Sequence, residues 1–181
     1  DVAALDAEAP ADACAAEVAA VREMVDGTGD ALPALELGLR WLELHRPAPA
    51  PARVVHGDLR LGNFLVGPDG LRAVIDWGFW QVGDPAEDLG GVGARPGRVG
   101  ADERVVAGVG DLAELLEGYG EEVDPQRLRW WGVLVQARWG AYCAQQAALR
   151  REGQHASLER TVLARRVAEA EWDMLDVLEA A

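Results

Sequence analysis

The chain has 181 residues and half of them are apolar, so it can bury a hydrophobic core of its own. The formal net charge of −14 argues against nucleic acid and against an anionic membrane surface as partners, because both attract clusters of basic side chains. All 17 strongly basic side chains are Arg, so this chain supplies no Lys to hold a phosphate group or to form a Schiff base.

The N-terminal quarter of the chain is predicted to form two helices. Residues 11–26 carry small and apolar side chains at helical spacing, and the stretch DGTGD at 26–30 ends this helix. Residues 31–46 form the second predicted helix, in which leucines recur on one face. The stretch PAPAPA at 47–52 predicts a stiff, extended connector.

The next stretch is predicted to form a small β structure. Residues 53–55 are a short strand, and residues 64–75 form a hairpin whose turn is the sequence GPDG at 67–70. The loop HGDLRLG joins the strand to the hairpin. Asp84 and Pro85 then begin a helix, as its N-cap and its first helical residue.

Most of the remaining chain is predicted to be helical. Seven glycines in residues 90–110 predict a mobile loop, and helices are expected at 111–118, 126–151 and 157–180. The tryptophans of the last two helices are expected to pack in the core: Trp130, Trp131, Trp139 and Trp172. The predicted fold is a single domain over residues 1–181, mainly α with a small β-hairpin (α+β).

The two cysteines, Cys14 and Cys143, are too few for a disulfide framework and lack the spacing of a metal site. They are expected to be buried or half-buried thiols in a reducing cytoplasm. No apolar run is long enough to cross a membrane, and the N-terminus lacks the pattern of a signal peptide. The protein is therefore expected to be cytoplasmic. Because the chain does not begin with Met, we expect it to be part of a longer protein.

Three polar residues, Asp58, Asn63 and Asp76, lie next to the predicted strands. Asp58 is in the loop after the first strand, and Asn63 and Asp76 flank the two ends of the hairpin, whose pairing brings them close together. Phosphoryl transfer from a nucleotide needs a group that accepts the proton of the attacking hydroxyl, and oxygen ligands for Mg²⁺. Asp58 can serve as the base, while Asn63 and Asp76 can bind the metal.

The spacing of Asp58 and Asn63 is that of a protein-kinase catalytic loop, in which four residues separate the catalytic Asp from a metal-binding Asn. The stretches HGDLRLGNFLV, AVIDWGFWQVGDPAEDLG and LRWWGVLVQARWG resemble the aminoglycoside phosphotransferase and choline kinase-like family. They are most similar to the branch that includes domains fused to acyl-CoA dehydrogenases. The resemblance covers nearly all of residues 10–180.

This resemblance implies a kinase-like fold of two lobes, in which the chain is the C-terminal lobe that binds substrate and metal. It implies a phosphotransferase that uses ATP or GTP and acts on an alcohol group. Asp58 resembles the catalytic base of the family, and Asn63 and Asp76 resemble its Mg²⁺ ligands.

The resemblance also implies supporting residues around the catalytic loop. His56 resembles a residue that shapes the loop, and Asp84 or Asp88 resembles a support that fixes the loop from the following helix. The family's smaller N-terminal lobe, with its phosphate-binding Lys, has no counterpart here, because the loop begins at residue 56 and the chain has no Lys. That lobe is an expected partner, and without it the chain is expected to bind nucleotide poorly and to be inactive.

Two other functions remain open on sequence alone. A kinase-fold binding module that has lost catalysis is one, although the presence of Asp58, Asn63 and Asp76 together argues against it. A metal-dependent phosphohydrolase is the other, and it would need more ligands than three histidines and these acids provide. The acceptor is expected to be a small hydroxylated molecule. An aminoglycoside, a choline-like alcohol, a sugar, a hydroxyacyl compound and a macrolide are all compatible with the fold.

Overall fold

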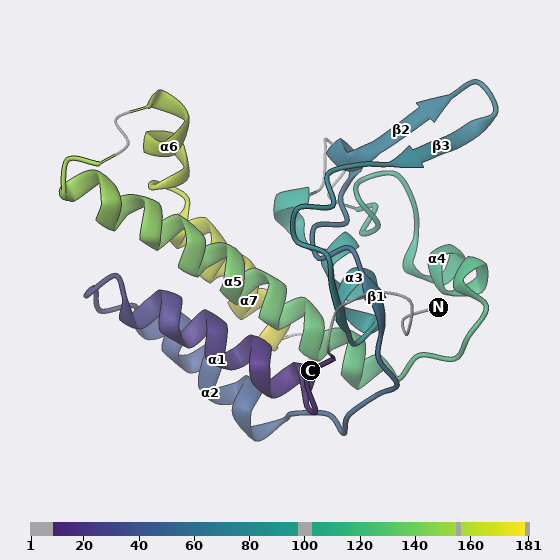
Figure 1. The fold of residues 1–181 in the computed structure, drawn as a ribbon, viewed down its shortest axis with the longest axis horizontal. Coiled ribbons are helices and arrows are strands. Elements are labelled where there is room, and N and C mark those ends of the chain that lie inside the picture. The colour runs from purple at the N-terminus through teal and green to yellow at the C-terminus, as the bar shows by residue number, and fades with distance from the viewer. Residues whose placement is uncertain (1–8, 98–102, 155–156, 180–181) are drawn as a thin grey trace. The chain divides into compact units, whose positions relative to one another are not determined.

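The computed structural model describes residues 9–97, 103–154 and 157–179 (Figure 1). Its secondary structure is mainly helical with two small antiparallel sheets, which confirms the predicted α+β class. No helix among these residues is long and apolar enough to cross a membrane.

The helices and strands agree with most of the sequence-based boundaries to within two residues. The helices are α1 (Ala13–Asp26), α2 (Pro33–Leu44), α3 (Ala86–Val92), α4 (Leu112–Tyr119), α5 (Pro125–Arg151), α6 (Leu158–Leu163) and α7 (Val167–Glu179). The strands are β1 (Arg53–Val55), β2 (Phe64–Gly67), β3 (Gly70–Val74) and β4 (Gln81–Gly83), and two 3₁₀ turns are η2 (Leu61–Asn63) and η3 (Arg95–Gly97).

The chain divides into two compact units, which are described separately. Unit 1 contains the residues up to Ala13 and Ala48–Gly132, and unit 2 contains Cys14–Pro47 and Val133–Ala181. Helix α5 contributes residues to both units. All of the residues proposed from the sequence as catalytic, metal-binding or supporting belong to unit 1.

Both sheets lie in unit 1. Strands β2 and β3 form the predicted hairpin, with Leu65 opposite Ala73 and a bulge after that pair. Strand β1 pairs antiparallel with β4, which places Val54 opposite Val82. Strand β4 was not predicted, because three residues are too short to show an alternating pattern. The pairing holds both ends of the segment that contains Asp58, Asn63 and Asp76.

Close packing of α3 against the first turns of α5 forms the core of unit 1. A Cβ atom added at Gly90 would lie 2.8 Å from the Cβ atom of Trp131, so the two helices meet where α3 has no side chain. Trp130 and Trp131 are fully buried, and their rings meet edge to face with centroids 5.1 Å apart. Val55 and Val82 of the β1–β4 sheet are also buried.

Unit 2 is a helical bundle built from α1, α2, α6, α7 and the larger part of α5. Leucines on one face of α2 are fully buried, as the helical spacing predicted, and Met174 of α7 is buried with them: the α2 residues are Leu35, Leu39 and Leu42. A Cβ atom added at Gly38 of α2 would overlap the Met174 side chain, so α2 and α7 are in direct contact.

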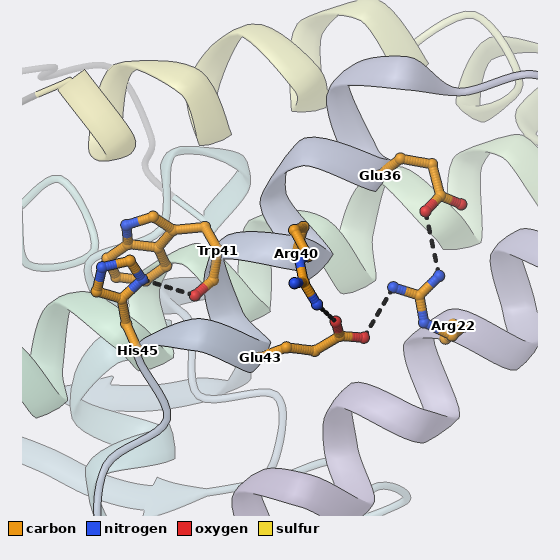
Figure 2. Close-up of polar contacts among 6 residues, drawn as sticks. All are labelled: Arg22, Glu36, Arg40, Trp41, Glu43 and His45. Carbon is orange, nitrogen blue, oxygen red and sulfur yellow. Dashed lines mark hydrogen bonds and ion pairs between the residues drawn. The ribbon is translucent and has the colours of Figure 1, made fainter.

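An exposed network of charges links α1 to α2 within unit 2 (Figure 2). Arg22 of α1 donates to Glu36 at 3.1 Å and to Glu43 at 2.9 Å, and Arg40 donates to Glu43 at 3.2 Å. Hydrogen bonding by Glu36 raises the pKa of Arg22. Such exposed pairs each contribute at most about 1 kcal/mol, so the network orients the two helices rather than holding the fold together.

The predicted helix at 157–180 is wrong in one respect, since it is two helices. Ser157 caps α6 as expected, accepting from the backbone N–H of Arg160 at 3.2 Å. The N–H groups of Arg165 and Arg166 then bond to carbonyls three residues back, which closes α6 before α7 begins. Residues 158–179 include no Gly or Pro, so no strong helix breaker marks this break in the sequence.

One further expectation needs correction and another is tested only in part. Trp172 is 67% exposed and does not pack in the core, and Trp139 is only half-buried. The glycine-rich stretch 90–110 includes the end of α3, the turn η3 and a bridge between Val106 and Gly110. Its residues 98–102 lie outside the described part of the chain, so the predicted mobility is not tested.

Both cysteines are buried and neither forms a disulfide, in agreement with the sequence. Burial raises the pKa of the Cys143 thiol from its ordinary 9.0 to about 11. The unfolded chain therefore loses this proton first as pH rises, so the stability contributed by the protonated thiol is present below pH 9 and is lost between pH 9 and pH 11.

We expect the free energy of unfolding to fall across that window by roughly 2 kcal/mol more in the wild type than in Cys143→Ala. Urea unfolding at several pH values measures this difference.

We also expect iodoacetamide at pH 8 to modify Cys143 only after denaturation, because the side chain is fully buried. Equal labelling of native and denatured protein would contradict the assignment.

Candidate active site

The loop after β1 carries the predicted site and is fixed by its backbone. Gly57 has a φ of 79°, in the left-handed region that favours glycine. The Asp88 carboxylate, on α3, accepts from the backbone N–H of His56 at 2.8 Å and from that of Gly57 at 3.0 Å. Two charge-assisted hydrogen bonds thus hold the start of the loop against the helix.

The buried ring of His56 joins the loop to the strand that precedes Asp76. Its Nε2 lies 2.9 Å from the carbonyl oxygen of Ile75, and its Nδ1 lies 3.2 Å from the backbone nitrogen of Asp58. The Asp58 N–H is the donor in the second contact, so Nδ1 is the acceptor and the neutral ring carries its proton on Nε2. The Trp77 ring lies against it, with centroids 4.6 Å apart.

Asp58 and Asn63 are in direct contact. The Asn63 Nδ2 donates to Asp58 Oδ2 at 2.9 Å and to the Asp58 carbonyl at 2.8 Å, while Arg60 Nε donates to the same Oδ2 at 3.0 Å. Asp58 Oδ1 accepts no hydrogen bond from the described residues, so one carboxylate oxygen is held and the other can bond a ligand. Asn63 Oδ1 is likewise without a donor among them, although the residue is buried.

Asp76 lies two residues after the end of β3, and its neighbour Ile75 bonds the backbone of Asn63. The Ile75 N–H donates to the Asn63 carbonyl at 2.9 Å, so Asp76 is adjacent in the chain to the residue that bonds Asn63, and the predicted nearness of the two is confirmed at the level of the backbone. Asp76 has a φ of 63°, a conformation that Asp tolerates better than most residues. Its exposed carboxylate forms no hydrogen bond or ion pair with the described residues.

Asp84 and Asp88 occupy different positions, which sequence did not distinguish. Asp88 bonds the 56–57 backbone, as described above. Asp84 is 3% exposed and accepts from the Ala86 N–H at 3.0 Å, from the Trp131 indole N–H at 3.0 Å and from the Arg127 guanidinium. These bonds tie the start of α3 to the first turns of α5.

Arg60 and Arg127 are residues at or near the site that the sequence did not single out. Arg60 bonds Asp58 and is 47% exposed, while Arg127 bonds Asp84 and the Ala48 carbonyl. Arg60 could have been found from its place two residues after Asp58. The pairing of Arg127 with Asp84 spans 43 positions, and no local pattern indicates it.

The donor set around Asp58 suits a hard divalent cation. The available atoms are carboxylate and amide oxygens, which Mg²⁺ prefers, and two of them are without donors among the described residues. No cluster of three or more His, Cys, Asp or Glu that could hold a metal is found in the described parts of the chain. A site made of two aspartates and one asparagine is compatible with that finding, since it contains only two such residues.

Gly57 provides a test of the loop geometry. A Cβ atom at this position would lie 2.4 Å from the carbonyl oxygen of Phe79, in addition to the cost of a positive φ. We expect Gly57→Ala to lower the free energy of unfolding by about 2–4 kcal/mol. Gly120→Ala is the matched control in the same unit, because Gly120 has a φ of 75° and nothing within 4 Å of its Cβ position.

Urea unfolding of the two variants separates backbone strain from the clash with Phe79. Gly120→Ala should cost only the strain, about 1–2 kcal/mol. If the two substitutions cost the same, the close approach of Gly57 to Phe79 is not a feature of the folded protein.

Comparison with known proteins identifies the family and the fold. Residues 3–131 match the model of a family described as the phosphotransferase enzyme family. A 60-residue stretch is 40% identical to acyl-CoA dehydrogenase family member 10 of Mus musculus, covering 32% of this chain and 6% of that protein.

A solved structure shares the fold. It is a putative aminoglycoside phosphotransferase from Ralstonia eutropha JMP134, similar with a TM-score of 0.75 and 20% sequence identity. The match covers 97% of this chain and 58% of the other. The chain therefore spans little more than half the length of that structure, and a small part of the mouse protein.

Proposed function

Because the chain belongs to the phosphotransferase enzyme family, we propose that it is the catalytic and metal-binding lobe of an ATP-dependent enzyme that phosphorylates a hydroxyl group of a small molecule. The observation that carries the proposal is the contact between Asp58 and Asn63 on a loop whose backbone is fixed by Asp88. Catalysis of phosphoryl transfer depends mostly on positioning the reacting groups. Hydrogen bonds from Asp88 hold the start of this loop, and the bond between Asn63 and Asp58 holds its end.

Asp58 is the proposed general base. Its Oδ2 is held by Asn63 and Arg60, which orients the carboxylate and leaves Oδ1 to accept the proton of an acceptor hydroxyl. Asn63 Oδ1 and the Asp76 carboxylate are the proposed Mg²⁺ ligands. When bound, the cation would neutralise charge on the nucleotide phosphates.

A nucleotide-binding lobe, N-terminal to this chain, is the proposed partner. Large apolar side chains are exposed on the hairpin and the segment after it, which is unusual for a surface in contact only with water. These residues are Leu65, Val66, Leu71, Trp77, Phe79 and Trp80. In Figure 1 the β2–β3 hairpin projects from the rest of unit 1. We refer to the chain joined to such a lobe as the two-lobed protein.

The proposed acceptor is a small hydroxylated molecule, and the donor is ATP or GTP. The description of the similar structure as an aminoglycoside phosphotransferase favours an aminoglycoside, and the likeness to an acyl-CoA dehydrogenase family member makes a hydroxylated acyl compound the other candidate. Location in the cytoplasm is part of the same proposal. The alternative is a kinase-fold binding module without catalysis, which would have no chemical need for an unengaged oxygen on Asp58.

The test is an assay of ADP or GDP release by the two-lobed protein over a panel of hydroxylated acceptors. We expect acceptor-dependent release with Mg²⁺ and none after chelation. The isolated 181-residue chain is expected to be inactive, because half of the nucleotide clamp is missing. Nucleotide binding without turnover on any acceptor would favour the binding module. Robust turnover by the isolated chain would reject the need for a second lobe.

A further inference from the structure

An open hollow in unit 2 is lined by three arginines and has no part in the proposed phosphotransfer. Its volume is about 390 Å³. Two segments line it: the last turns of α5, and α6 with the turn that follows. In each segment the second and third lining residues come three and four positions after the first. The lining residues are Ala147, Arg150 and Arg151, and Thr161, Ala164 and Arg165. Small side chains and arginines thus share the lining of the hollow.

The charges in this arginine hollow are only partly compensated. Arg151 donates to Asp30 at 2.8 Å and is the one arginine of the three that is paired with an acid. Arg150 and Arg165 are exposed and form no ion pair with the described residues. Two of the three arginines that line the hollow therefore have no acidic partner within residues 9–97, 103–154 and 157–179, in a chain whose net charge is −14.

Stabilisation of helix ends does not account for all three arginines. Arg150 and Arg151 lie in the last turn of α5, where positive charge is favourable. Backbone groups already close that end, since the Gly153 N–H donates to the Arg150 carbonyl at 3.0 Å and the Gln154 N–H to the Leu149 carbonyl at 2.9 Å. Arg165 lies in the turn between α6 and α7 and belongs to neither helix.

We propose that the arginine hollow binds a small ligand with two adjacent phosphate groups. A guanidinium group donates in a planar fork that matches phosphate oxygens, and two guanidinium groups with no acidic partner in the described part of the chain match a ligand with at least two negative charges. The Thr161 hydroxyl donates to the Ser157 carbonyl at 2.9 Å, so the arginines and not the hydroxyl supply the donors. The volume accommodates a diphosphate.

Inorganic pyrophosphate is the probe, titrated into the chain by calorimetry at low salt with EDTA present. We expect saturable binding, weaker by about tenfold in Arg150→Ala and in Arg165→Ala and by more in the double variant, as expected for the loss of charge-assisted hydrogen bonds. Arg40→Ala is the matched control, because it removes the same charge from an exposed position in unit 2, and its affinity should stay within about twofold of wild type.

The outcomes distinguish this site from the proposed active site. Asp58→Asn should leave pyrophosphate binding unchanged, because no metal is present and Asp58 lies in unit 1. Absence of saturable binding, or equal affinity in the wild type and the double variant, would overturn the proposal. A lower thermal midpoint in the arginine variants with unchanged affinity would assign these residues to the helix ends and would overturn it as well.

Discussion

Asp58→Asn is expected to lower the turnover of the two-lobed protein by about 10²–10⁴-fold, with little change in the affinity for ATP. The amide has the shape of the carboxylate, so Arg60 and Asn63 keep a neighbour of the same size. It cannot accept a proton from the acceptor hydroxyl at neutral pH. The loss should therefore appear in the chemical step and not in nucleotide binding.

Single-turnover transfer from ATP and a separate titration of ATP measure the two quantities. Asp69→Asn is the matched control, since Asp69 lies in the hairpin turn with its side chain 88% exposed. That variant should retain wild-type turnover. Near-normal turnover by Asp58→Asn would show that the base assignment is wrong.

Asp84→Ala is expected to lower the free energy of unfolding by about 3–5 kcal/mol. The substitution removes a buried carboxylate from the Arg127 guanidinium and from the Trp131 indole N–H, and both partners are themselves largely buried. Breaking a buried pair on one side leaves an uncompensated charge, which costs far more than the loss of an exposed pair.

Urea unfolding of unit 1, followed by the fluorescence of its buried tryptophans, measures the effect. Asp69→Ala removes an exposed carboxylate from the same unit and should change stability by less than about 0.5 kcal/mol. A cost below about 1 kcal/mol for Asp84→Ala would mean that the contacts of Asp84 do not hold α3 to α5.

Local chemistry explains why the loop and the hairpin could be predicted from the sequence. Pro68, Asp69 and Gly70 define a turn by their backbone preferences, and apolar residues on either side define the strands. The ends of a hairpin must meet, so the nearness of Asn63 and Asp76 follows from register alone. These features depend on residues close together in the chain.

Contacts between distant segments could not be predicted in the same way. The short strand β4 exists because β1 is available to pair with it, and its three residues carry no pattern of their own. The sequence predicted that either Asp84 or Asp88 supports the catalytic loop. It could not choose between them, because Asp84 lies just before α3 and Asp88 lies in its first turn. Which of them bonds the 56–57 backbone depends on how α3 packs, and that packing is set by Gly90 and Trp131.

The break between α6 and α7 and the exposure of Trp172 could not be predicted from local sequence either. Every residue from 158 to 179 tolerates a helix, so the periodic pattern predicts one continuous element. The burial of Ala170 and Met174 selects one face of α7, and that choice leaves Trp172 on the opposite side. A tryptophan at helical spacing is therefore weak evidence for burial when the helix has two apolar faces.

The most direct test of the proposed function is to measure whether Asn63 and Asp76 bind the metal. Mn²⁺ is a paramagnetic substitute for Mg²⁺ that accepts the same oxygen ligands, and its binding to the two-lobed protein with ATP can be followed by electron paramagnetic resonance. Asp76→Asn suits this measurement, because Asn tolerates the φ of 63° and the residue is exposed. We predict that Asp76→Asn and Asn63→Ala each weaken Mn²⁺ binding at least about tenfold, while Asp69→Asn leaves it unchanged. Equal Mn²⁺ affinity in all of these proteins would contradict the proposed site.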